Sequence, residues 1–137
     1  MENSTGPAKH ILIVDDEPLV SESVKMILTL DGHKADIAQS AEEALAKFNK
    51  DHYDIVVTDF AMPGMRGDEL ARNIKSASPS KPVVLLTAFP PVHLPPEIDV
   101  LVLKPCDATD LRDGIAEASG QCGDVSDEPA KAGTTSD

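Results

Sequence analysis

Polar side chains stand directly after four of the apolar runs in this sequence. The residues concerned are Asp15, Asp16, Asp59, Thr87 and Lys104. The carboxyl ends of the strands form the ligand crevice in open α/β sheets, so strands at these runs would bring the side chains into one cleft. Carboxylates gathered there repel one another unless cations offset their charge. Lys104 can supply one cation, and we expect Mg²⁺, which favours a few carboxylates plus waters, to supply the rest.

The apolar runs have the length and composition of strands buried on both faces. We expect strands over 10–14, 34–38, 54–58, 82–86 and 98–103. The spacing of apolar residues between the runs predicts helices that begin at Pro18, after Ser40, at Asp68 and after Asp107. Strands that alternate with helices in this way predict an α/β fold with a doubly wound, five-stranded parallel sheet.

The crossover between the last two expected strands departs from this pattern. Four of the ten residues 88–97 are prolines, which cannot continue a helix interior. We expect an extended, polyproline-like loop there, or at most one helical turn. The fourth helix of the doubly wound fold is therefore predicted to be missing or reduced to a loop.

Length and charge limit the classes of protein that this chain can represent. Its 137 residues suit one domain, which we expect over 9–119, between a flexible N-terminus (1–8) and a flexible acidic tail (120–137). The formal charge of −12 repels nucleic-acid phosphates, so no nucleic-acid partner is expected. No apolar run approaches the roughly 18 residues of a membrane span, and the N-terminus lacks the apolar core of a signal peptide. We expect a soluble cytoplasmic protein with no membrane partner.

Four short motifs stand in a fixed order along the chain, each at the end of an expected strand. They are Val14-Asp15-Asp16, Asp59 within Thr58-Asp59-Phe60-Ala61-Met62-Pro63-Gly64-Met65-Arg66-Gly67, Thr87-Ala88, and Lys104-Pro105. In order and spacing, residues 9–119 resemble the receiver domain of bacterial two-component response regulators. The resemblance implies a flavodoxin-like sheet with strand order 2-1-3-4-5.

The resemblance also implies a role for each matching residue. Asp59 would be the phosphoacceptor, taking a phosphoryl group from a phosphohistidine of a histidine kinase or histidine phosphotransferase. Asp16 would bind Mg²⁺ directly and Asp15 mainly through water, together with Asp59 and the backbone carbonyl of Ala61. The phosphoryl-binding and switch residues would be Thr87, Ala88, Lys104 and Pro105. Phosphoryl transfer spreads negative charge over the equatorial oxygens, which positioned cations stabilise.

Several positions depart from the family pattern. Leu101 stands where receivers commonly carry the aromatic switch residue, Cys106 replaces the usual Phe, and the proline-rich loop replaces the fourth helix. In that family the residues two positions after the acceptor and two after the strand-four Thr tune the lifetime of the phosphorylated state, and the resemblance places Ala61 and Phe89 there. Neither offers a side-chain hydrogen bond to water, so slow self-dephosphorylation is expected.

Other function classes fit the sequence less well. A haloacid-dehalogenase-like phosphatase would need Asp-x-Asp after the first strand, and a dinucleotide enzyme would need G-x-G-x-x-G there. A pseudo-receiver binding module usually lacks the acidic pair, the acceptor or the lysine, all of which are present. We therefore expect a signalling phosphoacceptor rather than an enzyme, phosphorylated also by small phosphodonors and able to dephosphorylate itself. It would be a stand-alone receiver that acts on an unknown downstream protein, with a receiver fragment of a longer response regulator as the alternative.

Overall fold

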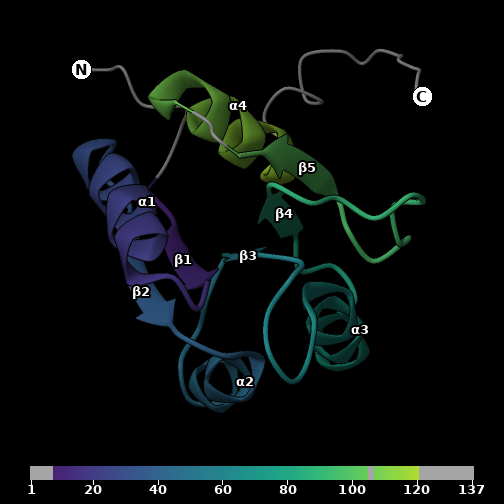
Figure 1. Ribbon diagram of the computed structural model, residues 1–137. Coiled ribbons are helices and arrows are strands. Elements are labelled where there is room, and N and C mark those ends of the chain that lie inside the picture. Colours follow the sequence, from purple (N-terminus) through teal and green to yellow (C-terminus); the bar gives the residue numbers. More distant parts are fainter. Residues whose placement is uncertain (1–7, 105–106, 121–137) are drawn as a thin grey trace.

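The computed structural model describes residues 8–104 and 107–120 of the chain (Figure 1). The expected N-terminal segment and acidic tail therefore lie outside the described residues, apart from Ala8 and Gly120. Pro105 and Cys106 lie outside them as well. No helix within the described ranges is long and apolar enough to cross a membrane.

A single five-stranded sheet forms the centre of the described part of the chain. Its strands are β1 (His10–Val14), β2 (Lys34–Ala38), β3 (Ile55–Thr58), β4 (Val83–Thr87) and β5 (Val100–Leu103). They lie in the order β2-β1-β3-β4-β5, and each neighbouring pair is parallel. The expected fold class and strand order are confirmed.

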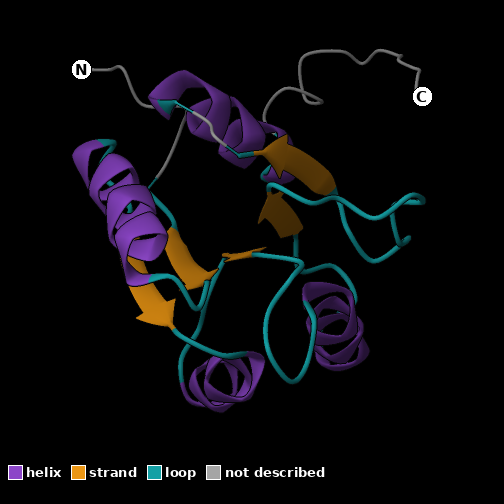
Figure 2. Cartoon of the chain, in the orientation of Figure 1, coloured by secondary structure: helices purple, strands orange, loops and turns teal. Residues whose placement is uncertain are grey.

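Helices cover both faces of the sheet (Figures 1 and 2). They are α1 (Pro18–Leu30), α2 (Ala41–Lys50), α3 (Gly67–Ala77) and α4 (Ala108–Ala118). One apolar core, which includes Leu12, Val56 and Leu85, lies between the sheet and helices α2 and α3. A second, which includes Ile13 and Val57, lies on the α1 and α4 face. Burial on both faces explains why the strands are continuous apolar runs.

Local capping explains where the helices begin. Pro18 stands at the start of α1, where its missing N–H costs no hydrogen bond. Ser40 Oγ accepts a hydrogen bond from the Glu43 N–H at 3.0 Å, as expected for a capping box. The Glu43 carboxylate, however, accepts from the N–H of Gln39 rather than from that of Ser40. At α4 the capping box is complete: the Asp107 side chain accepts from the Asp110 N–H, and the Asp110 side chain accepts from the Asp107 N–H.

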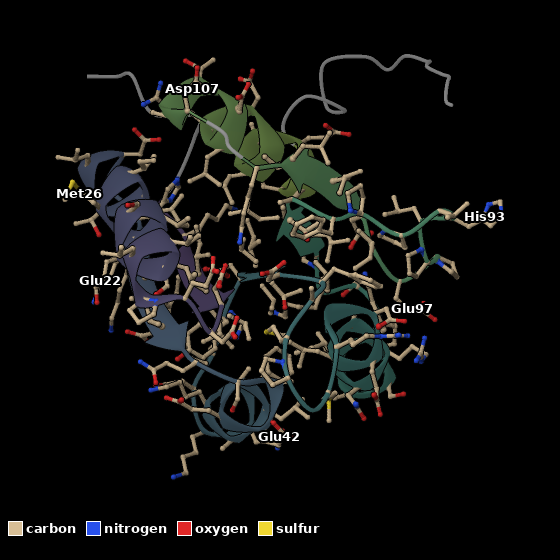
Figure 3. The ribbon with its side chains drawn as sticks, in the orientation of Figure 1. Glu22, Met26, Glu42, His93, Glu97 and Asp107 are labelled. Atoms are coloured by element: carbon tan, nitrogen blue, oxygen red, sulfur yellow. The ribbon has the colours of Figure 1, made fainter. Side chains whose placement is uncertain are left out.

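The crossover from β4 to β5 contains no helix, which confirms the prediction from its prolines. It runs out from the sheet as a loop (Figure 1), and Figure 3 shows His93 pointing outward at its far end. The strand β5 begins two residues later than expected because Ile98 donates its N–H to the Pro95 carbonyl within the loop. The Ile98 side chain is nevertheless buried in the α2 and α3 core.

Candidate functional site

The expected site residues lie together at the carboxyl ends of the strands. Backbone hydrogen bonds continue one residue past the strands: Asp15 N–H donates to Ala38 O at 3.1 Å and Asp59 N–H donates to Val14 O at 3.0 Å. Lys104 N–H donates to Thr87 O at 2.9 Å. These bonds hold Asp15, Asp59 and Lys104 at the carboxyl ends of parallel strands, where ligands bind in open α/β sheets.

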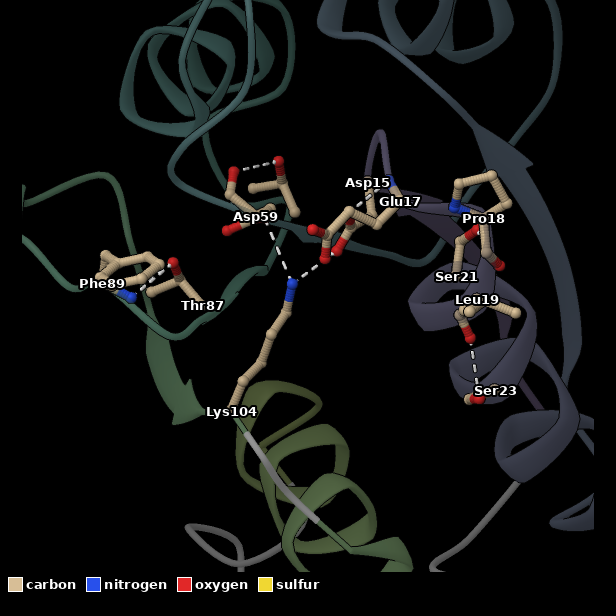
Figure 4. Close-up of polar contacts among 11 residues, drawn as sticks. Asp15, Glu17, Pro18, Leu19, Ser21, Ser23, Asp59, Thr87, Phe89 and Lys104 are labelled. Atoms are coloured by element: carbon tan, nitrogen blue, oxygen red, sulfur yellow. Dashed lines mark hydrogen bonds and ion pairs between the residues drawn. The ribbon is translucent and has the colours of Figure 1, made fainter.

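The side chain of Lys104 joins two of the carboxylates (Figure 4). Its Nζ lies 2.8 Å from Asp15 Oδ2 and 3.2 Å from Asp59 Oδ2. Asp15 is only 3% exposed and Asp59 only 8%. Burial lowers the pKa of the Lys104 ammonium, but the hydrogen bonds and charges of Asp15 and Asp59 outweigh it and hold this pKa above its ordinary value. Lys104 is therefore a cation at neutral pH.

The acidic cluster can hold a metal ion. Asp15, Asp16 and Asp59 each offer a carboxylate oxygen, and these oxygens lie within 4.8 Å of one another. Asp16 is exposed, whereas the other two are buried. One ammonium does not offset three carboxylates, so a second cation would be attracted here. Hard oxygen donors of this kind suit Mg²⁺.

The two sides of the Asp15 carboxylate are already engaged by the protein. Oδ1 accepts a hydrogen bond from the N–H of Glu17 at 2.9 Å, and Oδ2 accepts from Lys104. No side-chain hydrogen bond or ion pair of Asp16 is found among the described residues. The two neighbouring acids are thus not equivalent in what they can offer a metal.

The end of β4 contributes three further residues to the site: Thr87, Ala88 and Phe89. Thr87 is fully buried, and its Oγ1 accepts a hydrogen bond from the Phe89 N–H at 3.2 Å. Within the described residues no hydrogen bond joins the Thr87 side chain to Asp59. Ala88 is exposed, and the Phe89 side chain is 74% exposed. This arrangement leaves Phe89 pointing largely into solvent.

Three further positions that were singled out from the sequence are Ala61, Leu101 and Pro105. Ala61 is exposed in the loop that follows Asp59, two residues after the carboxylate. Leu101 lies within β5, opposite Leu85 in the register with β4, and is 37% exposed. Pro105 directly follows Lys104 but lies outside the described residues.

Gly67 begins α3 one residue before the helix start expected at Asp68, and it has a positioning role that was not predicted from the sequence. A Cβ atom at this position would lie 2.1 Å from the backbone oxygen of Asp59. The Gly67 N–H also donates to Phe60 O at 3.0 Å, which holds the start of α3 against the chain after β3. Only glycine allows this approach, so the backbone of Asp59 depends on Gly67. The sequence signal was a glycine at the junction of the loop and a predicted helix.

Comparisons with known proteins agree with this geometry. The family model for the response regulator receiver domain matches residues 11–116. The two-component response regulator PhoP of Pseudomonas aeruginosa is 38% identical over 78 residues, which cover 57% of this chain and 35% of that protein. The chain spans about a third of the length of the curated relatives it matches.

Solved structures of whole receivers are similar over most of the chain. The response regulator protein TrrA from Thermotoga maritima, in complex with Mg(2+)-BeF, is 35% identical with a TM-score of 0.76, covering 80% of this chain and 98% of that one. A CheY-like receiver domain protein from Methanospirillum hungatei is 28% identical with a TM-score of 0.78, covering 86% and 99%. The family match extends over most of the described residues and includes each strand end that carries a site residue. This chain therefore belongs to the response regulator receiver domain family of two-component systems.

Proposed function

We propose that Asp59 accepts a phosphoryl group from a phosphohistidine of a histidine kinase or histidine phosphotransferase. The observation that carries the proposal is the buried Asp59 carboxylate beside the Lys104 ammonium, 3.2 Å away, within an acidic cluster at the carboxyl edge of the sheet. A family member with this arrangement has both a nucleophile and a cation at the position where the charge of a phosphoryl group would develop.

The transfer would proceed as an in-line displacement at phosphorus. A carboxylate oxygen of Asp59 forms the new P–O bond while the P–N bond to the donor imidazole breaks. That nitrogen keeps the bonding electron pair, and neutral imidazole leaves with its proton on the other ring nitrogen. The product on Asp59 is an acyl phosphate. Lys104 would meet the charge on one phosphoryl oxygen, and the Thr87 hydroxyl and the Ala88 N–H would donate hydrogen bonds to others once the phosphoryl group is present.

The carboxylate cluster suits Mg²⁺, which Asp16, Asp59 and the backbone carbonyl of Ala61 would bind directly and Asp15 mainly through water. Bound there, Mg²⁺ would supply positive charge to the transferring group. The engagement of both Asp15 oxygens by Glu17 N–H and Lys104 supports an outer role for Asp15. The exposed carboxylate of Asp16 supports a direct one.

Different effects on Mg²⁺ binding are therefore expected from Asp16→Asn and Asp15→Asn. Both variants remove one negative charge, but only Asp16→Asn removes a direct ligand. We expect about a tenfold loss of affinity from the loss of an outer contact in Asp15→Asn and a loss of about 100-fold in Asp16→Asn. Titration of both variants with MgCl₂, followed by amide chemical shifts, measures this difference. Equal affinities of the two variants would show that the ligand roles are misassigned.

The lifetime of the acyl phosphate is expected to be long. Hydrolysis needs a water molecule in line with the P–O bond, and the side chains of Ala61 and Phe89 cannot orient one by hydrogen bonding. We expect the double variant Ala61→Asn, Phe89→Glu to lose its phosphoryl group at least about tenfold faster than the parent protein. A rate increase of this size corresponds to a modest contribution of the new side chains to general acid–base catalysis of hydrolysis. Phos-tag gels or intact mass at timed intervals follow the loss. An unchanged half-life would refute this account of the lifetime.

The proposed role is that of a phosphoacceptor switch, not of an enzyme acting on a separate substrate. We propose that it acts in the cytoplasm through a downstream protein partner, as a stand-alone receiver or, alternatively, as the receiver part of a longer response regulator. The excess of acids over basic residues supports a protein partner over nucleic acid.

Incubation with a small phosphodonor tests the proposal without knowledge of the kinase. With acetyl phosphate or phosphoramidate and MgCl₂, the intact mass of the protein should increase by one phosphoryl group. Hydroxylamine should reverse the increase, because it cleaves acyl phosphates, and EDTA should prevent it. A protein that stays unmodified by both donors while it binds Mg²⁺ would instead be a pseudo-receiver.

A further inference from the structure

Thr58 places a hydroxyl group inside the sheet, directly before Asp59. It ends β3, whose other residues are isoleucine and valine, and its side chain is fully buried. In the register it lies between Val14 of β1 and Leu85 of β4, which both belong to the core on the α2 and α3 face. Side chains alternate between the two faces along a strand, so Thr58 shares this face with Val56. A hydroxyl buried among apolar side chains costs free energy unless it forms a hydrogen bond.

The hydroxyl of Thr58 is bonded to the backbone of the next residue. Its Oγ1 donates a hydrogen bond to Asp59 O at 2.9 Å. No other donor to Asp59 O is found in the described part of the chain. Gly67 lies against the same oxygen, so close that a Cβ atom there would stand 2.1 Å from it. Because the peptide unit is planar, a fixed carbonyl also fixes the direction in which the chain leaves Asp59.

The three carbonyl oxygens that follow β3 differ in what they contact. Asp59 O accepts from the Thr58 hydroxyl, and Phe60 O accepts from the Gly67 N–H at 3.0 Å. Among the described residues, no hydrogen bond to Ala61 O is found. A carbonyl oxygen that no protein donor occupies is a suitable ligand for a hard cation. The Ala61 carbonyl is therefore the first one after β3 that no described donor engages.

We propose that Thr58 is a positioning residue for Mg²⁺: its hydroxyl holds the Asp59 carbonyl on the α3 side of the sheet and so keeps the Ala61 carbonyl available to the acidic cluster. Thr58 can act in this way only if Asp59 and Ala61 bind Mg²⁺, so its role rests on the proposed function. The Thr58 side chain contacts neither the metal nor the phosphoryl group. Its effect passes through the backbone, as expected of a group that orients a metal ligand.

Two substitutions separate this role from a contribution to stability alone. Thr58→Val keeps the branched shape of the side chain but removes the hydrogen-bond donor. Thr58→Ser keeps the donor but removes a buried methyl group, which should leave a small cavity and destabilise the protein. If Thr58 only stabilised the fold, the affinity for Mg²⁺ would follow the stability of each variant. If Thr58 positions the ligand, the affinity follows the presence of the hydroxyl.

Titration of the full chain with MgCl₂, without phosphodonor, measures the affinity through the amide chemical shifts of residues 59–62. We expect Thr58→Val to bind Mg²⁺ about tenfold more weakly than the parent protein, the lower end of the effect of removing a group that orients a metal ligand. Thr58→Ser should bind with the affinity of the parent protein, although its thermal unfolding midpoint should be lower. The ¹³C resonance of the Asp59 carbonyl reports the hydrogen bond itself and should move more in Thr58→Val than in Thr58→Ser.

Ser119→Ala is the matched control, because it also removes a hydroxyl that donates to a backbone carbonyl. Ser119 Oγ donates to Ala116 O at 2.9 Å at the C-terminal end of α4. None of the residues proposed to bind Mg²⁺ lies in α4, so this variant should keep the affinity of the parent protein.

Two results would overturn the role of Thr58 while leaving the metal site intact. Equal affinities of Thr58→Val and the parent protein would show that the hydroxyl does not position a ligand. Equal losses in Thr58→Val and Thr58→Ser would assign Thr58 to stability alone. A parent protein that binds no Mg²⁺ would refute the proposed metal site, and the role of Thr58 with it, so the two failures are distinguishable.

Discussion

Asp59→Asn is expected to abolish incorporation of a phosphoryl group from acetyl phosphate. An amide oxygen is a much weaker nucleophile than a carboxylate, and the substitution also removes the charge that Lys104 approaches at 3.2 Å. The variant should fold normally, because asparagine has the same shape and the change reduces repulsion among the three acids. The effect should be complete within the sensitivity of intact-mass measurement.

The matched control for this variant is Asp51→Asn, which removes one exposed carboxylate after α2. It should be phosphorylated at the same rate as the parent protein. Thermal unfolding of both variants confirms that each is folded. Full phosphorylation of Asp59→Asn would show that another residue is the acceptor.

Gly67→Ala is expected to destabilise the protein and to slow phosphorylation together. The added methyl group would lie 2.1 Å from the backbone oxygen of Asp59, so either α3 or the chain at Asp59 must move. Overpacking against backbone, which cannot rotate away, should cost about 3 kcal/mol in the free energy of unfolding. Movement of Asp59 away from Lys104 should also lower the rate of phosphoryl transfer, because that rate depends on positioning.

Chemical denaturation and timed phosphorylation measure the two effects of Gly67→Ala. Ser76→Ala is the control, since it also introduces alanine into α3 but at an exposed position. We expect it to change neither stability nor rate by a measurable amount. A Gly67→Ala protein with the stability and rate of the parent would contradict the positioning role of Gly67.

The fold could be predicted largely because the strands are buried on both faces. Continuous apolar runs such as Ile11 to Val14 are short and β-branched, which favours buried strands over helices, and four prolines exclude a helix from residues 88–97. Boundaries were less predictable. The shift of β5 to Val100 depends on the hydrogen bond from Ile98 to Pro95 within the loop, which leaves no pattern in the sequence.

The candidate site could be predicted as far as it depends on strand ends. Asp15, Asp59, Thr87 and Lys104 all follow from the rule that parallel strands end at one edge. This rule does not give the distances between side chains. The ion pairs of Lys104 with both Asp15 and Asp59 could therefore be seen only in the structure. The need for glycine at position 67 arises from the approach of α3 to Asp59, a contact between elements that spacing alone does not predict.

The strand β5, which pairs with β4 alone in the described part of the chain, illustrates a different limit of the sequence. The absence of the fourth helix was predictable, but its consequence for the surface was not. Only the structure shows that Leu101 and Leu103 remain exposed and that Asp113 and Glu117 line a groove beside the strand.

Borohydride reduction of the phosphorylated protein tests the central claim most directly. Borohydride converts an acyl phosphate of aspartate into homoserine, and peptide sequencing by tandem mass spectrometry then identifies the modified position. The account predicts homoserine at position 59 and unmodified aspartate at positions 15 and 16. Homoserine at any other position, with Asp59 intact, would contradict it.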